Sequence, residues 1–292
     1  MSLNKGYVLQ ILTIFVLLLT TSPAGAVPPQ RVVATNNNSG RAMVIPEHAI
    51  EIAPNVFSLG TGIDPQTGKQ VEGLMFVHYR DGYSHKPNHD PGSSGGDATT
   101  NCYSYLASGA KWKSVENWIM NSANSEGLGE ATLFALQDAA LAKWEDAADG
   151  IVGTGIGFNI FGSGSPTFTA LSADTSSPDG QNEVYFGDVG SPGAIAVTIV
   201  WGYFGGRPSA RQLIEWDQVY DQVDFDWSAE DAGVSGKMDF YNIAVDEDGH
   251  AAGMGHPSDS CTEETMYRYG ATGETKKRDL NAGDIAGVNK LY

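Results

Sequence analysis

Basic residues are scarce in this chain of 292 residues. Lysine and arginine together number 17, against 35 aspartates and glutamates, which gives a formal net charge of −18. Binding to nucleic acid or to anionic membranes needs a basic face that neutralises phosphate groups. The composition therefore argues against both kinds of partner. The excess of acid is compatible with high solubility, with a salty habitat, or with sites for divalent cations such as Ca²⁺.

Cysteine is also rare, with only Cys102 and Cys261 in the whole sequence. Neither cysteine belongs to a C-x-x-C pair, so a thiolate zinc site is not indicated. In an exported protein an even number of cysteines favours a disulfide. A bridge between these two would close a long loop and stabilise the fold by about 4–5 kcal/mol in the chain-entropy model, less any strain in the folded state.

Only the N-terminus has an apolar run that approaches the length of a membrane span. Lys5 precedes an apolar stretch from Val8 to Leu19, and the small residues Ala-Gly-Ala follow at 24–26. This order of charged, apolar and small-residue segments is typical of a cleaved export signal. The stretch is too short to cross a bilayer comfortably. We therefore predict a signal peptide over residues 1–26, a secreted mature protein and no stable membrane anchor.

A change of composition divides the rest of the chain. Residues 86–97 are rich in proline, glycine, serine and asparagine, which is typical of a linker. Two short strand patterns precede it, at residues 56–60 and 74–79. We predict an N-terminal pro-segment or accessory region over residues 27–100 and a main domain over residues 101–292.

The main domain has the pattern of an α+β fold. Apolar residues at helical spacing predict a helix over residues 128–148, and a second helix is expected over residues 238–252. The apolar, β-branched residues of 194–203 predict a strong strand. Further strands are expected at residues 112–120, 184–186 and 213–225.

The most informative stretch is Asp246-Glu247-Asp248-Gly249-His250, with Gly253 and His256 after it. On a helix, residues four apart share one face, so positions 246 and 250 point the same way and Glu247 flanks them. Gly253 can end the helix and turn the chain back, because glycine tolerates a left-handed conformation. His256 can then reach the same ion. Three protein ligands and one water make a catalytic zinc site, in which a nearby glutamate takes the proton of that water.

This stretch resembles the H-E-x-x-H-x-x-G-x-x-H motif of the metzincin metalloproteases, most closely that of the matrixin-like branch. Ten residues later, Glu264-Thr265-Met266-Tyr267 is similar to the Met-turn of the same family. Residues 238–244 look like the start of its active-site helix, and residues 279–292 look like its closing helix. The resemblance covers about residues 102–292.

The resemblance implies a twisted mixed sheet with a backing helix, an active-site helix and a small C-terminal subdomain. It implies zinc bound by His250 and His256, Glu247 as the general base, and Met266 as an apolar support below the metal. Substrates would be proteins or peptides that pair with the strand at 194–203, which is the edge strand in this family.

The sequence departs from the family at position 246, where Asp stands in place of the first zinc-binding histidine. Aspartate can bind zinc through oxygen, although its charge would make the zinc-bound water less acidic. Asp246 is therefore either the third zinc ligand of a weakened enzyme or the mark of an impaired relative that binds peptide or protein without cleaving it.

We predict the first alternative, a secreted zinc-dependent endopeptidase with Asp246, His250 and His256 as ligands. A serine hydrolase is not indicated, because the G-x-S-x-G spacing occurs only at residues 92–96, within the linker-like stretch, and does not form a nucleophile elbow between a strand and a helix. The remaining histidines precede the main domain and are expected at the surface or in the linker. They are His48, His78, His85 and His89.

Overall fold

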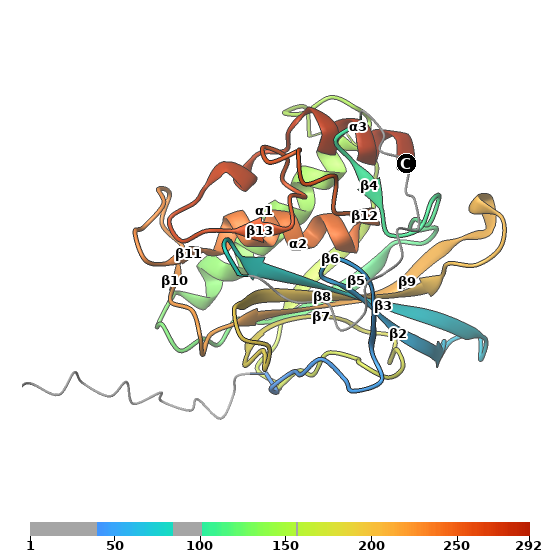
Figure 1. Cartoon of the computed structure of the whole chain (residues 1–292), viewed down its shortest axis with the longest axis horizontal. Helices are drawn as coiled ribbons and strands as arrows, with labels where there is room; N and C mark the ends of the chain where they lie inside the picture. The colour runs from blue at the N-terminus through green and yellow to red at the C-terminus, as the bar shows by residue number, and fades with distance from the viewer. Residues whose placement is uncertain (1–39, 84–100, 156) are drawn as a thin grey trace, which may run out of the picture. The chain divides into compact units, whose positions relative to one another are not determined.

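One nine-stranded sheet organises the molecule (Figure 1). The computed structural model describes residues 40–83, 101–155 and 157–292. The expected signal peptide and the expected linker at 86–97 lie outside these residues. The described residues belong to one compact unit. Along the sheet the strands are β1 (Ile50–Ala53), β2 (Val56–Ile63), β3 (Gln70–Arg80), β8 (Ala194–Tyr203), β9 (Gln212–Asp221), β7 (Asn182–Gly187), β5 (Glu116–Asn121) and β6 (Phe161–Pro166), while β13 (Tyr269–Gly270) pairs with β3.

The sheet is mixed, as predicted. Strands β9, β7, β5 and β6 run parallel to one another, and β8 pairs with β9 in the antiparallel direction. All six residues of β7 are buried, and so are nine of the ten residues of β8. Strands covered on both faces need apolar residues at almost every position, which explains the continuous apolar pattern of 194–203. The expected α+β fold is confirmed.

The N-terminal strands extend this sheet beyond β8. β3 pairs antiparallel with β8 from Glu72 opposite Gly202 to Tyr79 opposite Ala194. The strand at 194–203 is therefore an interior strand in this structure, and the expectation that it forms the edge is wrong. Its partner is apolar along most of its length, and both faces of β3 are buried. Residues 50–80 thus share one sheet with the main domain.

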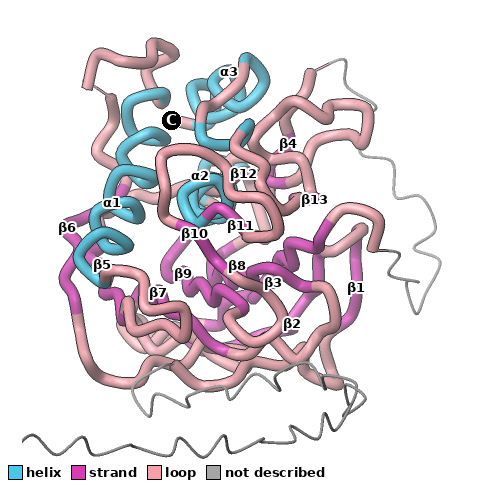
Figure 2. Tube along the Cα trace, turned by 90° about the vertical axis from the view of Figure 1, so that its left-hand side faces the viewer, coloured by secondary structure: helices cyan, strands magenta, loops and turns pink. Residues whose placement is uncertain are grey.

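The three α-helices of the described residues lie on the same side of the sheet (Figures 1 and 2). They are α1 (Glu130–Ala147), α2 (Phe240–Ala251) and α3 (Ala282–Leu291). The buried side of α1 includes Leu133, Leu141 and Trp144, the residues whose spacing predicted it. The indole of Trp144 donates a hydrogen bond of 2.7 Å to the carbonyl of Val245, which joins α1 to α2. At the start of α2 the side chain of Asp239 accepts from the backbone N–H of Asn242.

The remaining elements are short and connect the layers. They are β4 (Ser104–Tyr105) paired with β12 (Met254–Gly255), β10 (Trp227–Ser228) paired with β11 (Met238–Asp239), and the 3₁₀ turns η1 (Pro208–Ala210) and η2 (Lys276–Arg278). Among the described residues, no helix is long and apolar enough to cross a membrane.

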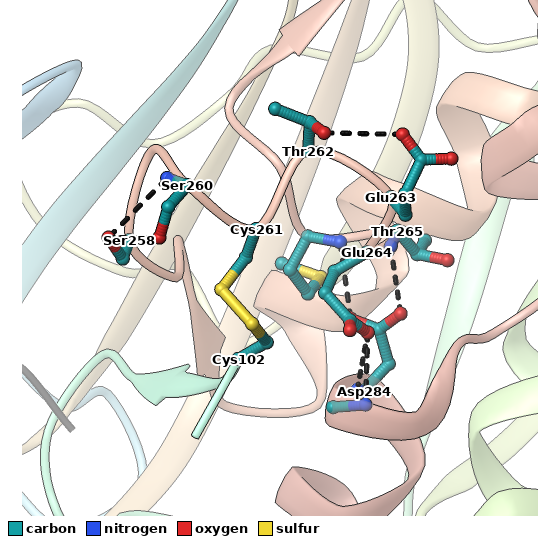
Figure 3. The surroundings of a disulfide bond; sticks show 11 residues. Cys102, Ser258, Ser260, Cys261, Thr262, Glu263, Glu264, Thr265 and Asp284 are labelled. Carbon is teal, nitrogen blue, oxygen red and sulfur yellow. Dashed lines mark hydrogen bonds between the residues drawn. A yellow bond between two sulfur atoms is a disulfide. The ribbon is translucent and has the colours of Figure 1, made fainter. Parts of the chain in front are cut away.

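The structure contains the expected disulfide between Cys102 and Cys261, which are 159 positions apart (Figure 3). The loop after Cys261 is also fastened to the start of α3. Glu264 accepts a 3.0 Å bond from the N–H of Gly283, and Asp284 accepts a 2.8 Å bond from the N–H of Thr265 (Figure 3). The covalent bridge and these bonds therefore hold the loop that leads to Met266.

If β3 is part of the folded core, shortening a side chain within it must destabilise the whole domain. Met75 is fully buried, so Met75→Ala is expected to lower the free energy of unfolding by about 2–5 kcal/mol. Gln70→Ala, at an exposed position of the same strand, should change it by less than about 0.5 kcal/mol. Denaturant unfolding of both variants measures this, and wild-type stability of Met75→Ala would show that β3 is not part of the core.

Candidate metal centre

Helix α2 carries the central residues of the site, and they are buried. Asp246 and Glu247 have no exposed surface, and His250 is 1% exposed. The helix packs closely on Met266. A Cβ atom at Gly249 would come within 2.1 Å of the sulfur of Met266. Met266 is itself fully buried. The structure therefore places the Met-turn methionine directly against the helix of the site.

The turn after α2 brings the two histidines together. Gly253 has a φ of 104°, and a Cβ atom there would lie 2.9 Å from the carbonyl oxygen of Ala110. A residue with a side chain is therefore strained at this position. Past this turn the chain returns, and Nε2 of His256 lies 3.1 Å from Nε2 of His250.

The arrangement of the two imidazoles fits a zinc ion. Nδ1 of His250 lies 3.0 Å from the carbonyl oxygen of Met254, a contact that uses Nδ1 as the donor and leaves the lone pair on Nε2. Two nitrogens bound to one tetrahedral zinc at about 2.0–2.1 Å would be about 3.3 Å apart, close to the observed separation.

The charge state of the histidines also suits a metal. Burial lowers the pKa of His250 to about 4. Burial, followed by the proximity of His250, lowers the pKa of His256 well below its usual value. Both imidazoles are thus neutral near pH 7, which is the form that binds a metal ion.

Asp246 is turned towards an ammonium group and an imidazole. Its Oδ2 atom lies 3.2 Å from Nζ of Lys277 and also contacts Nδ1 of His78. Burial, and then the charge of Lys277, lower the pKa of His78, so its imidazole is neutral near pH 7. Burial opposes ionisation of this carboxyl, but Lys277 and then His78 outweigh it, so the pKa of Asp246 lies below its usual value. The other oxygen, Oδ1, is buried and accepts no hydrogen bond.

The predicted ligands therefore do not all converge. Among the described residues, two groups of three or more place their ligand atoms within 4.8 Å of one another, His78–Asp246–Glu247 and Asp174–Glu215–Asp217. The set of Asp246, His250 and His256 is not one of them. The structure brings His250 to His256, and it brings Asp246 to His78 and Lys277. The ligand role of Asp246 remains a prediction that depends on its Oδ1 atom.

Lys277 comes from η2 and has no exposed surface. Its ammonium donates to the carbonyl oxygen of Tyr267 as well as to Asp246. Its backbone N–H donates a 2.8 Å bond to the side chain of Asn242 on α2. Lys277 does not stand out in the sequence, because it lies between Lys276 and Arg278 and looks like one residue of a solvated basic run.

The expectation that His78 lies at the surface is wrong. It is 1% exposed, because it belongs to β3, where both faces are covered. A Cβ atom at Gly270 would lie 2.8 Å from its Nε2 atom, so glycine is required on the neighbouring strand β13. The apolar run around position 78 is the signal that could have placed this histidine inside.

Strand β3 also covers the two imidazoles of the site. The ring of Phe76 stacks on His250 with a centroid separation of 4.1 Å and an interplanar angle of 18°. The same ring meets His256 edge-on at 5.8 Å. β3 thus supplies an apolar wall to the histidine pair and an imidazole to Asp246.

Glu247 points towards the sheet. Its Oε2 atom accepts a 2.5 Å hydrogen bond from the hydroxyl of Thr198 on β8. Its Oε1 atom is buried without a hydrogen bond and lies 3.7 Å from Nδ1 of His78. Burial, and then the charge of Asp246, raise the pKa of Glu247 well above its usual value. A bound divalent cation would lower the pKa of Glu247.

Asp248 lies in a separate polar network. It is fully buried, and its Oδ1 atom accepts from the side-chain amides of Gln137 at 2.7 Å and Gln218 at 3.0 Å. Asp248 therefore links α2 to α1 and β9 and does not form part of a solvated helix face.

Residues 108–292 match the family model of the matrixins, a family of peptidases. The match covers more than half of the chain, so the chain belongs to the matrixin family. A comparison with curated proteins found no match. The assignment confirms the resemblance seen in the sequence and makes this chain a member of a family of zinc metalloproteases.

Replacing Lys277 with an uncharged side chain should leave the negative charge of buried Asp246 without its cationic partner. We expect Lys277→Met to lower the free energy of unfolding by about 3–5 kcal/mol in a chelator, because the variant leaves a buried carboxylate with one partner fewer. Excess zinc should recover part of this loss, since a bound cation would replace the ammonium. Denaturant unfolding with and without zinc measures both effects.

The neighbouring lysine provides a matched control. Lys276 keeps 35% of its side chain exposed and pairs with Glu274 at 3.0 Å, so Lys276→Met should change stability by less than about 1 kcal/mol. Wild-type stability of Lys277→Met in chelator would contradict the role assigned to the buried ion pair.

Proposed function

We propose that this matrixin is a secreted zinc-dependent endopeptidase. The observation that carries the proposal is the approach of His250 and His256 to 3.1 Å, with Glu247 one helical turn before His250. Their neutral Nε2 atoms would hold the metal, and the free Oδ1 atom of Asp246 is the third candidate ligand. Zinc bound there would acidify a water molecule and polarise a peptide carbonyl.

The chain's own groups supply the remaining chemistry. Glu247 would take the proton of the attacking water and pass it to the departing amine, as a general base and then a general acid. Thr198 holds this carboxyl by its hydroxyl and so limits its rotation. Phe76 packs on His250 and shields the pair of imidazoles from bulk water. The substrate class is protein or peptide, as in the family.

Secretion is supported by two features of the chain. The first 26 residues have the pattern of an export signal, which is removed from exported proteins. The disulfide between Cys102 and Cys261 suits an oxidising compartment.

Two observations favour a second candidate, a matrixin that binds peptide or protein without cleaving it. Asp246 already has a cationic partner in Lys277, which competes with a metal for its charge, and its Oδ2 atom also contacts the imidazole of His78. In addition, β3 occupies the side of β8 on which an extended substrate would pair. The contact with Lys277 would weaken metal binding by Asp246, and the pairing of β3 with β8 leaves no free β8 edge for a substrate strand.

Metal content and turnover distinguish the two candidates. The mature chain is purified, its zinc is measured by mass spectrometry, and casein cleavage is followed with and without a zinc chelator. An endopeptidase should bind one zinc and lose its activity in the chelator. Glu247→Gln should retain the zinc and lower kcat/KM by about 10²–10⁴-fold, since it removes the general base.

Glu72→Gln serves as the control, because Glu72 is exposed on β3 and should leave activity unchanged. Bound zinc without cleavage in the wild type would support the non-cleaving candidate. Cleavage that survives both the chelator and Glu247→Gln would contradict the proposed mechanism.

A further inference from the structure

A pocket outside the zinc centre lies where β5 and β6 end and α1 begins. Its volume of about 380 Å³ is within the range of about 300–1,000 Å³ that is usual for ligand sites. In the sheet, β9 and β7 separate β5 from β8, the strand that contacts Glu247. None of the residues that line the pocket belongs to the zinc centre. They include Met120, Ser122, Glu130, Phe134, Pro166 and Phe168.

Apolar side chains from three segments form much of the wall. Met120 near the end of β5 is fully buried, Phe134 on α1 is half-buried, and Phe168 after β6 is 75% exposed. The ring of Phe134 stacks on buried Trp118 with a centroid separation of 5.1 Å and an interplanar angle of 22°. Aromatic rings and thioethers pack favourably against another aromatic ring. The wall therefore favours an aromatic ligand.

One polar side chain of the pocket has no partner. Ser122 is 5% exposed, and within the described part of the chain its buried hydroxyl oxygen has no hydrogen bond. A buried hydroxyl without a partner costs free energy, and the group can either donate or accept. A phenol or an indole would supply the missing hydrogen bond while its ring contacts the apolar wall.

Glu130 determines the charge at the pocket. It is exposed in the first turn of α1, and among the described residues that line the pocket it alone is charged. The whole chain carries a net charge of −18. An anionic ligand would therefore be repelled, whereas a cationic group beside the aromatic ring would be attracted.

The pocket lies next to an edge strand. In the described residues β6 is the last strand at this end of the sheet, and its sequence FGSGSP has no charged side chain that would protect the edge. Pro166 pairs with Met120, so both side chains point to the face of the sheet that α1 covers. An extended peptide paired with β6 would place every second side chain on this face. One of these side chains would enter the pocket.

We propose that this pocket binds an aromatic side chain from an extended, basic peptide segment of another protein. The segment adds a strand to β6, and its tyrosine or tryptophan ring packs against Phe134 and Phe168. The polar atom of that ring reaches Ser122, and a neighbouring arginine or lysine pairs with Glu130. A free aromatic molecule would gain nothing from the edge of β6, which favours the peptide. The site holds its peptide whether or not the zinc centre cleaves it.

NMR spectroscopy of the mature chain, labelled with ¹³C at the methionine methyl groups, tests this proposal. The Glu247→Gln variant is used so that the probe is not cleaved. The probe is an acetylated pentapeptide amide with tyrosine at its centre, serine on both sides and arginine at both ends. It should shift the resonance of Met120, assigned with Met120→Leu, and leave that of Met266 unchanged. This readout requires neither zinc nor cleavage, so its failure is distinct from failure of the proposed function.

Phe168→Ala tests the aromatic wall. Because Phe168 is 75% exposed, the variant should fold, and its affinity for the probe should fall by about 10-fold or more, as for other aromatic anchors. Phe158→Ala is the matched control, since Phe158 is 49% exposed and does not line the pocket, and it should bind like the parent chain. Ser122→Ala should weaken binding of the tyrosine probe and leave that of a phenylalanine probe unchanged.

Four results would overturn the proposal. They are no shift of Met120 with the probe, unchanged affinity in Phe168→Ala, equal binding of a probe with glutamate in place of both arginines, and an equal effect of p-cresol. The last result would assign the pocket to free aromatic molecules, because p-cresol has the ring of tyrosine without a peptide backbone.

Discussion

The approach of His250 to His256 is the interaction on which the rest of the site depends. A helix alone cannot present both imidazoles to one point, because residues six positions apart lie on different faces of a helix. Gly253 ends α2 with a positive φ and lies so close to Ala110 that a side chain has no room. The contact of His250 with the carbonyl oxygen of Met254 then orients the ring, and Phe76 packs on its face. These local constraints prepare two neutral nitrogens for one ion.

Charge compensation at position 246 is the second constraint. A carboxylate without exposed surface needs partners, and Asp246 has Lys277 and His78. Both partners come from outside α2, one from η2 and one from β3. The position that carries a zinc-binding histidine in the family is thus part of a buried ion network in this chain. Zinc and Lys277 would compete for the same negative charge.

Local patterns predicted much of the fold. The helices have apolar residues at helical spacing, and the strand at 194–203 has a continuous apolar run. The structure contains these elements at almost the predicted residues. The motif around His250 and the glycine at 253 likewise predicted that the two histidines would meet. These features depend on residues close together in the sequence, so the sequence alone is informative about them.

Contacts between distant segments were not predictable in this way. The pairing of β3 with β8 joins residues more than a hundred positions apart, and nothing in either strand specifies its partner. His78 and Lys277 owe their burial to such contacts, and so does the cluster of Asp174 with Glu215. Lys277, Asp174 and Glu215 looked like ordinary polar residues in polar or mixed segments, and only the apolar run around His78 gave a local sign of burial. Their roles became visible only when the sheet and the turns placed them.

X-ray absorption at the zinc edge of the purified mature chain tests the central claim most directly. The account predicts zinc with two imidazole nitrogens at about 2.0–2.1 Å, completed by oxygen ligands and without sulfur. Loss of one of the two imidazoles in His256→Ala would assign His256 as a ligand. A chain that binds no zinc, or a zinc environment with fewer than two imidazoles, would contradict the convergence of His250 and His256 on one metal ion.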